Sequence, residues 1–168
     1  MTPKARFSQK DIFDFHTDDK AYVSGTPWNN TLPTSSVVSL GTYTGSNGSN
    51  NMIMYAWHSV EGFSKIGSYI GNGSANGPFV YTGFKPAWIM VKRTDSADNW
   101  AIYDSVRDTF NVRDSYLLAD SSQAEATFST AIVDFLSNGF KWRGAVNFGN
   151  NSSGTYIYMA FAEQPFKY

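Results

Sequence analysis

The feature that most constrains the fold is a series of strand-like segments separated by Asn-Gly turns over residues 62–93. The sequence there reads GFSKIGSYIGNGSANGPFVYTGFKPAWIMVKR, and its most apolar part, residues 86–91, has the length of a strand. Aromatic and β-branched residues suit a pleated, half-buried surface, whereas Asn, Gly and Ser suit tight turns. This stretch therefore predicts a β-sheet, and it contains no catalytic motif.

Composition supports a sheet-rich fold and excludes one class of partner. The chain has 168 residues, enough for one domain with its own core. Aromatic residues make up 17% of the sequence and charged residues only 16%, so Ser, Thr, Asn and Gly must supply much of the surface polarity. The net charge is −1 and the basic residues form no cluster. Without a basic surface the chain is not expected to bind nucleic acid.

The absence of cysteine excludes several kinds of chemistry. A chain with no Cys cannot form disulfides, thiolate nucleophiles, cysteine-type zinc sites or iron–sulfur clusters. The sequence also has no apolar segment near the roughly 20 residues that a membrane helix needs. We therefore expect no membrane insertion, no cofactor and no metal, and a fold stabilised by its core alone.

The N-terminal residues 1–27 differ from the rest of the chain. They mix charges with isolated aromatics and show no sustained period of two or 3.6 residues, which predicts an irregular arm. A short helix around residues 8–15, with Ser8 at its N-cap, fits the local pattern. Such an arm would pack either on a neighbouring protein or on its own domain.

From Trp28 onward the pattern is one of short strands and polar turns. Residues 137–139, Ser-Asn-Gly, predict a hairpin turn, because Asn-Gly tolerates positive φ angles. Residues 28–168 therefore predict a single β domain. The expected strands are residues 37–40, 52–57, 64–70, 78–82, 87–92, 100–104, 116–118, 127–136, 140–143 and 156–162.

Residues 34–57 align with residues 137–161 when one residue of slack is allowed. Gly41 then falls on Gly144, Asn47 on Asn151 and Ile53 on Ile157. One interpretation is a duplication, in which residues 62–168 form one complete unit and residues 28–61 resemble the closing hairpin of a preceding unit. The alternative is a chance match within a chain rich in Asn, Gly and Ser.

Three segments occur in a fixed order: GFSKIGSY, then GPFVYTGFKPAWIMVKR, then TYIYMAFAEQPF. As a set they resemble a repeat domain of unknown function found in virion proteins of tailed bacteriophages, and the resemblance covers residues 28–168. It implies an antiparallel β-sandwich of the jelly-roll or lectin-like kind, located in the virion as a tail-fibre, tail-associated or capsid-decoration protein. It carries over no catalytic or ligand-binding residue.

Five carboxylates could supply the two acids of a glycosidase, which must lie about 5 to 10 Å apart across a cleft. Solvated surface acids are the commoner case, and the chain is expected not to be an enzyme. The five residues are Glu61, Asp104, Asp108, Glu125 and Glu163.

Other polar motifs have ordinary structural explanations. His58 stands at the end of an expected strand, where a half-buried and hydrogen-bonded histidine is commoner than a base or ligand. The loop at residues 71–77 lacks the lysine and following helix of a phosphate-binding loop. Three acids could bind a calcium ion through their carboxylate oxygens, but their spacing does not fit an EF-hand. They are Asp95, Asp98 and Asp104.

Two functions from different classes follow. The first is a non-enzymatic virion structural protein, expected to form a homo-oligomer and to bind other virion proteins. The second is a receptor-binding, lectin-like module for host surface glycans, because an exposed aromatic ring beside polar side chains can stack on sugars. The candidate interaction surface consists of Trp28, Asn99, Trp100, Arg107 and Arg113.

Overall fold

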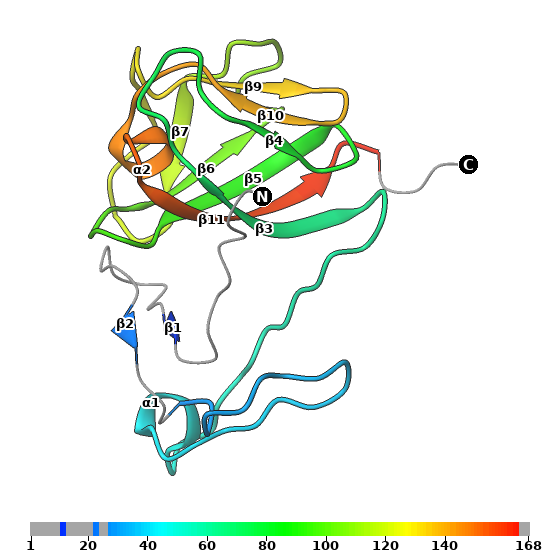
Figure 1. Ribbon diagram of the computed structural model, residues 1–168, viewed down its shortest axis with the longest axis vertical. Helices are drawn as coiled ribbons and strands as arrows, with labels where there is room; N and C mark the ends of the chain where they lie inside the picture. The colour runs from blue at the N-terminus through cyan, green and yellow to red at the C-terminus, as the bar shows by residue number, and fades with distance from the viewer. Residues whose placement is uncertain (1–10, 13–21, 24–26, 165–168) are drawn as a thin grey trace. The chain divides into compact units, whose positions relative to one another are not determined.

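A computed structural model of the protein describes residues 11–12, 22–23 and 27–164 (Figure 1). The chain divides into two compact units, which we call unit 1 (residues 1–13 and 21–56) and unit 2 (residues 14–20 and 57–168). The main division therefore falls after residue 56, between the boundaries expected at residues 27 and 61. Each unit is described by itself.

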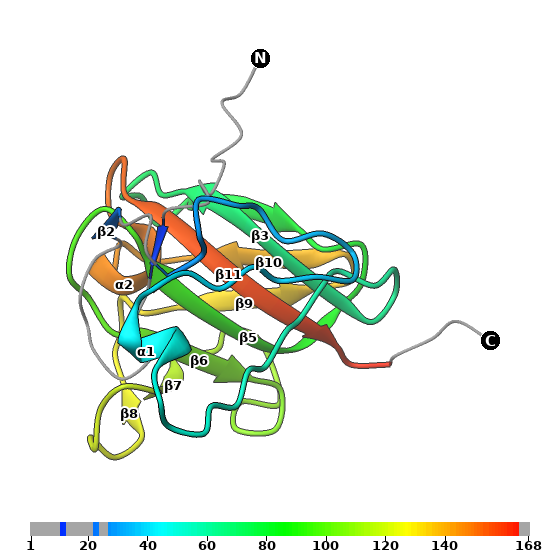
Figure 2. The ribbon, with the colours of Figure 1, turned by 90° about the horizontal axis from the view of Figure 1, so that it is seen from below.

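Unit 2 contains two antiparallel sheets that pack face to face (Figures 1 and 2). The larger sheet has the order β3-β11-β5-β6-β7-β8, with bounds Ser64–Ile70, Thr155–Ala162, Pro86–Arg93, Trp100–Asp104, Ser115–Leu118 and Ala126–Thr127. The smaller sheet has the order β4-β10-β9, with bounds Phe79–Tyr81, Gly139–Trp142 and Val133–Leu136. The predicted all-β, antiparallel sandwich is confirmed.

The strand β11 lies at the centre of the longest ladders. It pairs antiparallel with β3 on one side and with β5 on the other. Its side chains alternate, so that Tyr156, Tyr158 and Ala160 are buried while the residues between them are partly exposed. This period of two is the one that the sequence predicted for residues 156–162.

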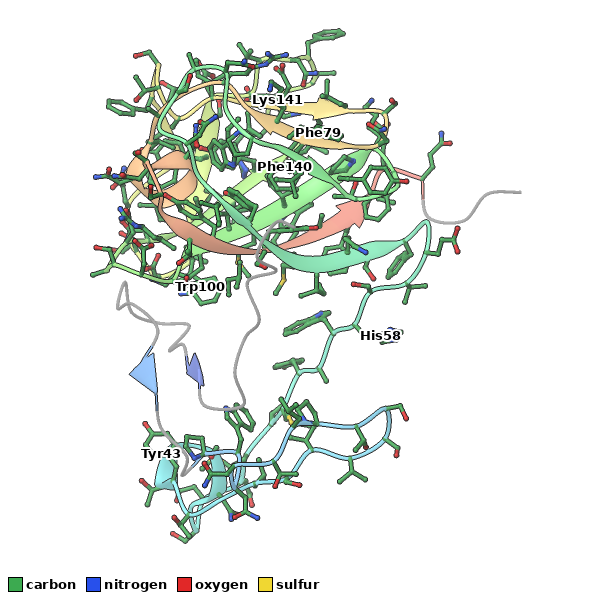
Figure 3. All side chains as sticks on the ribbon, viewed as in Figure 1. Tyr43, His58, Phe79, Trp100, Phe140 and Lys141 are labelled. Atoms are coloured by element: carbon green, nitrogen blue, oxygen red, sulfur yellow. The ribbon has the colours of Figure 1, made fainter. Side chains whose placement is uncertain are left out.

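Aromatic side chains from both sheets form the core of unit 2. Phe140 of β10 lies between the sheets (Figure 3), with ring centroids 6.0 Å from Tyr69 and 5.4 Å from Tyr158. Trp142, also on β10, meets Tyr103 of β6 edge-on at 5.7 Å. Burying each of these rings contributes on the order of 1.5–3 kcal/mol. The two sheets are thus held together mainly by aromatic packing.

The predicted hairpin at residues 137–139 is confirmed, but the reason for its glycine differs. Strands β9 and β10 pair with Leu136 opposite Gly139. The φ angle of Gly139 is not positive. A Cβ on Gly139 would instead lie 2.2 Å from the carbonyl oxygen of Val80 in β4. The glycine is therefore required by the close approach of the neighbouring strand.

The single strand expected over residues 127–136 is wrong, because the structure contains two short strands there. Strand β8 ends at Thr127 and β9 begins at Val133. Between them Ala131 is fully buried, and its carbonyl accepts a hydrogen bond from the Tyr103 hydroxyl at 2.9 Å. This connection carries the chain from the larger sheet to the smaller one.

In unit 1 the described N-terminal residues form a two-residue ladder between β1 (Asp11–Ile12) and β2 (Tyr22–Val23). The helix expected over residues 8–15 is therefore wrong at residues 11–12, and its remainder lies outside the described residues. So does most of the predicted arm. A short helix, α1 (Thr44–Asn47), follows a turn at residues 34–37.

The strands expected at residues 37–40 and 52–57 are not formed, since neither segment is assigned to a strand. A strand exists only where a ladder forms, and the described part of unit 1 contains only the β1–β2 ladder. The second helix of the chain, α2 (Asn147–Asn150), belongs to unit 2. Among the described residues no helix is long and apolar enough to cross a membrane.

Candidate functional site

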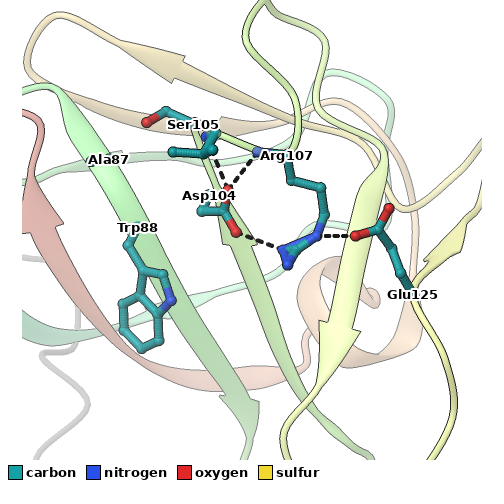
Figure 4. Close-up of a pocket in the computed structure, with 7 residues that line it drawn as sticks. Ala87, Trp88, Asp104, Ser105, Arg107 and Glu125 are labelled. Carbon is teal, nitrogen blue, oxygen red and sulfur yellow. Dashed lines mark hydrogen bonds and ion pairs between the residues drawn. The ribbon is translucent and has the colours of Figure 1, made fainter.

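An open pocket of about 580 Å³ lies on unit 2 beside strands β5 and β6 (Figure 4). Trp88 reaches it from β5, and Asp104 stands at the end of β6. Arg107 comes from the following loop, and Glu125 directly precedes β8. The pocket therefore joins one aromatic ring, two carboxylates and one guanidinium.

Arg107 holds both carboxylates of this pocket. Its Nη1 donates to Asp104 Oδ2 at 2.6 Å, and its Nε donates to Glu125 Oε2 (Figure 4). The other oxygen of Asp104 accepts the backbone N–H groups of Val106 at 2.9 Å and Arg107 at 2.7 Å. A glycosidase needs one acid that gives up a proton and one carboxylate free to act as base or nucleophile. Here one guanidinium pairs with both carboxylates. This arrangement fits the polar wall of a binding pocket better than the acid and base of a glycosidase.

The other three candidate glycosidase carboxylates lie outside the pocket. Asp108 Oδ2 accepts the N–H of Asp114 at 3.0 Å and that of Ser115 at 2.8 Å, so it fixes the loop before β7. Glu163 pairs with Lys85 at 2.8 Å. Glu61 is exposed. The structure thus brings together only two of the five acids, Asp104 and Glu125.

Two residues of the expected interaction surface are buried. Trp100 is 6% exposed and Arg113 is 2% exposed, so neither presents a surface to a ligand. Trp100 lies on the face of β6 that also carries Ile102 and Asp104, opposite to the core residues Ala101 and Tyr103. The guanidinium of Arg113 lies 4.5 Å from the centroid of the Phe135 ring, and this burial lowers the pKa of Arg113. Both are therefore packing residues.

The remaining three residues have different surroundings. Asn99 is half-buried and donates from Nδ2 to Asp120 at 3.3 Å. Trp28 is half-buried in unit 1. Only Arg107 lines the pocket. Sequence reasoning missed Trp88 there, because residues 86–91 have the apolar pattern of a wholly buried strand.

Trp88 is only partly buried and provides the aromatic face of the pocket. Its ring centroid lies 5.6 Å from that of Phe161 on the neighbouring strand β11. The contact with Phe161 fixes the orientation of the indole, while Arg107 fixes the acids beside it. The pocket is therefore formed in advance of any ligand.

The other polar motifs have structural partners. His58 is exposed, not half-buried as expected, and its Nδ1 lies 3.1 Å from the carbonyl of Ser59. In the loop at residues 71–77, Asn72 Oδ1 accepts the N–H of Ser74 at 3.0 Å, which is turn chemistry. Asp95 pairs with Arg93 at 3.0 Å. The described residues contain no group of three or more His, Asp or Glu side chains placed to hold a metal ion.

A family model described as a domain of unknown function (DUF7483) matches residues 3–165. The chain belongs to this family. The match spans both units, so the DUF7483 domain includes unit 1 together with the sandwich. A search of curated proteins and a search of solved structures gave no match.

Proposed function

We propose that this protein is a non-enzymatic structural protein of a tailed-bacteriophage virion that binds neighbouring virion proteins. The three segments that resemble such proteins contain β4, β5, β11 and all but the last residue of β3. Strands β3, β11 and β5 are adjacent in the larger sheet, and β4 belongs to the smaller one. The resemblance therefore draws on both sheets of unit 2.

The observation that carries the proposal is an apolar loop on unit 2 between β6 and β7. Val106 is 88% exposed and Phe110 is 82% exposed, and Val112 on the same loop is exposed as well. Large apolar side chains clustered on a surface mark protein–protein contacts. An assembly protein needs such a surface.

The test is to look for the protein in purified phage particles. We expect mass spectrometry of gradient-purified virions to find it at a constant copy number, and gold-labelled antibodies to mark one position on the particle. Particles assembled with Phe110→Asp should contain less of the protein than particles with Thr109→Asp, a control on the same exposed loop. Absence of the protein from pure particles would overturn the proposal.

A second candidate function is recognition of host surface glycans at the Trp88 pocket. An indole face beside a guanidinium and carboxylates is a common way to bind a sugar ring. Calorimetric titration with host polysaccharide should then give binding that Trp88→Ala abolishes. Phe79→Ala removes another exposed aromatic ring on β4 and serves as the control. Equal binding by both variants would reject this candidate.

A further inference from the structure

The Trp88 pocket carries more negative than positive charge. Among the seven residues that line it, Asp104 and Glu125 are acidic and Arg107 is basic. Two carboxylates against one guanidinium give the lining a formal net charge of −1. A site lined mainly by one sign of charge concentrates ligands of the opposite sign and repels those of its own sign. The pocket therefore favours a cationic ligand over an acidic one.

The polar contacts within the pocket fix Arg107 and Asp104. Two nitrogens of the Arg107 guanidinium are engaged, because Nη1 donates to Asp104 and Nε donates to Glu125 (Figure 4). Asp104 uses both of its oxygens, since Oδ2 accepts from Arg107 and Oδ1 accepts two backbone N–H groups. These contacts hold the two carboxylates in place before a ligand arrives.

Glu125 is the carboxylate that can contact a ligand. Its side chain is 52% exposed, whereas that of Asp104 is 18% exposed. Glu125 binds Arg107 through Oε2, and within the described part of the chain Oε1 has no hydrogen-bond donor. A carboxylate oxygen with this exposure accepts hydrogen bonds from a charged donor, which are shorter and stronger than those from a neutral donor.

The indole of Trp88 provides the apolar wall beside these carboxylates. Trp88 and Asp104 are opposite each other in the β5–β6 ladder, so their side chains are neighbours on one face of the larger sheet. The face of an indole attracts cations through its quadrupole, and its apolar surface can stack on a sugar ring. The pocket thus joins a stacking surface to an acceptor for a positive charge.

The size and lining of the pocket indicate what kind of cation fits. Its volume of about 580 Å³ is that of a site for a small organic molecule. A quaternary ammonium group has no N–H to donate and is typically held by a cage of aromatic rings, whereas the described lining contains one ring. A primary ammonium group has N–H donors that a carboxylate accepts. A ring that carries a primary ammonium group matches both walls.

We infer that the Trp88 pocket binds an amino sugar, a saccharide with a protonated primary amine. The sugar ring stacks on the indole of Trp88, and the ammonium group donates to Oε1 of Glu125. This inference deepens the glycan recognition described above as the second candidate function, and it rests on that function. It adds that a positive charge on the sugar decides which glycans are bound.

The test compares three sugars of similar size that differ in charge. Glucosamine, glucose and glucuronic acid are titrated into the full chain at about pH 6, where a sugar amine is protonated. Shifts in the amide NMR signals of Ser105 and Val106, which line the pocket, report binding. We expect glucosamine to bind at least about tenfold more tightly than glucose, and glucuronic acid to bind least.

Two matched variants locate the site of the ammonium group. Glu125→Gln removes the charge while keeping the size of the side chain, so it should abolish the preference for glucosamine over glucose. Glu163→Gln is the control, because Glu163 is also an exposed, ion-paired carboxylate but does not line the pocket. It should keep the wild-type preference. Trp88→Ala should abolish the binding of both sugars.

Three results would overturn the inference. They are equal binding of glucosamine and glucose, an unchanged preference in Glu125→Gln, and tighter binding of Nα-acetyl-lysinamide than of glucosamine. The last result would assign the pocket to a lysine side chain of a partner protein. Equal binding of the two sugars leaves glycan recognition standing, whereas no binding of any sugar rejects glycan recognition as well. None of these results alters the expected presence of the protein in virions.

Discussion

The Tyr69 hydroxyl accepts a hydrogen bond from Trp142 Nε1 at 2.7 Å and so joins the two sheets of unit 2. The same hydroxyl donates to the carbonyl of Gly149 at 2.7 Å. Tyr69 lies on β3 and Trp142 on β10, so the contact crosses the aromatic core. Burial raises the pKa of Tyr69 well above its ordinary value. The hydroxyl therefore remains a donor over the physiological range.

Removing this hydroxyl should destabilise the sandwich. Tyr69→Phe leaves the Trp142 N–H and the Gly149 carbonyl without their partner, and a buried polar group left unsatisfied costs about 1–3 kcal/mol. We expect that loss in the free energy of unfolding measured by urea titration. Tyr81→Phe changes an exposed tyrosine on β4 and should have no measurable effect. Equal stability of the two variants would contradict the structural role of Tyr69.

The protein should lose stability in alkali because of buried tyrosines on β11. Burial raises the pKa of Tyr156 and that of Tyr158 to about 12, from an ordinary value of 10.0. Between these values the unfolded chain releases the protons and the folded chain retains them. The free energy of unfolding should thus be constant below pH 10 and fall as the pH rises toward about 12, by roughly 2–3 kcal/mol per tyrosine.

Replacing one of these tyrosines tests the origin of that loss. Tyr158→Phe removes one of the linked protons, so its unfolding free energy should fall less steeply between about pH 10 and pH 12. Urea titrations across this range, together with phenolate absorbance, measure the slope. Tyr81→Phe serves as the control and should keep the wild-type slope. An unchanged slope in Tyr158→Phe would show that other groups cause the loss.

The fold could be predicted from the sequence wherever a strand and its ladder partners belong to one unit. Residues 64–70 and 156–162 have strand patterns and form β3 and β11, which pair with each other. Residues 52–57 have an equally good pattern and form no strand in the described structure. The alternation of apolar and polar residues shows that a segment favours the strand conformation. A strand also requires a neighbouring backbone with which to form hydrogen bonds.

The pocket could not be predicted because its residues are distant in the sequence. Trp88 and Glu125 meet only through the pairing of β5, β6 and β7 and the loops that follow. The sequence predicts that some tryptophans are exposed, but it cannot tell what covers each one. Trp88 and Trp100 lie on the same face of the larger sheet, where Trp100 is buried and Trp88 lines the pocket.

Asn150 should be among the most sensitive polar residues of unit 2. It is fully buried, its Nδ2 donates to the carbonyls of Ser74 and Gly144, both at 2.9 Å, and its Oδ1 accepts the N–H of Asn72 at 2.8 Å. Asn150→Ala removes three hydrogen bonds, of which the one to the Gly144 carbonyl is buried, and should cost about 3 kcal/mol of unfolding free energy.

A substitution of Asn47 in unit 1 is the matched control. Asn47 is exposed and its side chain donates to the carbonyl of Gly41, so Asn47→Ala should cost less than about 1.5 kcal/mol. Urea titration of both variants gives the comparison. A larger loss for Asn47→Ala than for Asn150→Ala would mean that unit 1 is the more tightly ordered of the two.

Gly144 should tolerate no side chain, because a Cβ there would overlap the backbone of the connection between β8 and β9. The built Cβ lies 1.9 Å from the carbonyl oxygen of Thr130, and a backbone atom cannot move aside as a flexible side chain can. Gly144→Ala should therefore cost about 3 kcal/mol or more, the upper end for overpacking. Ala145→Ser alters the next, exposed residue and should change the melting temperature little. If Gly144→Ala melts with the wild type, the connection yields to the methyl group.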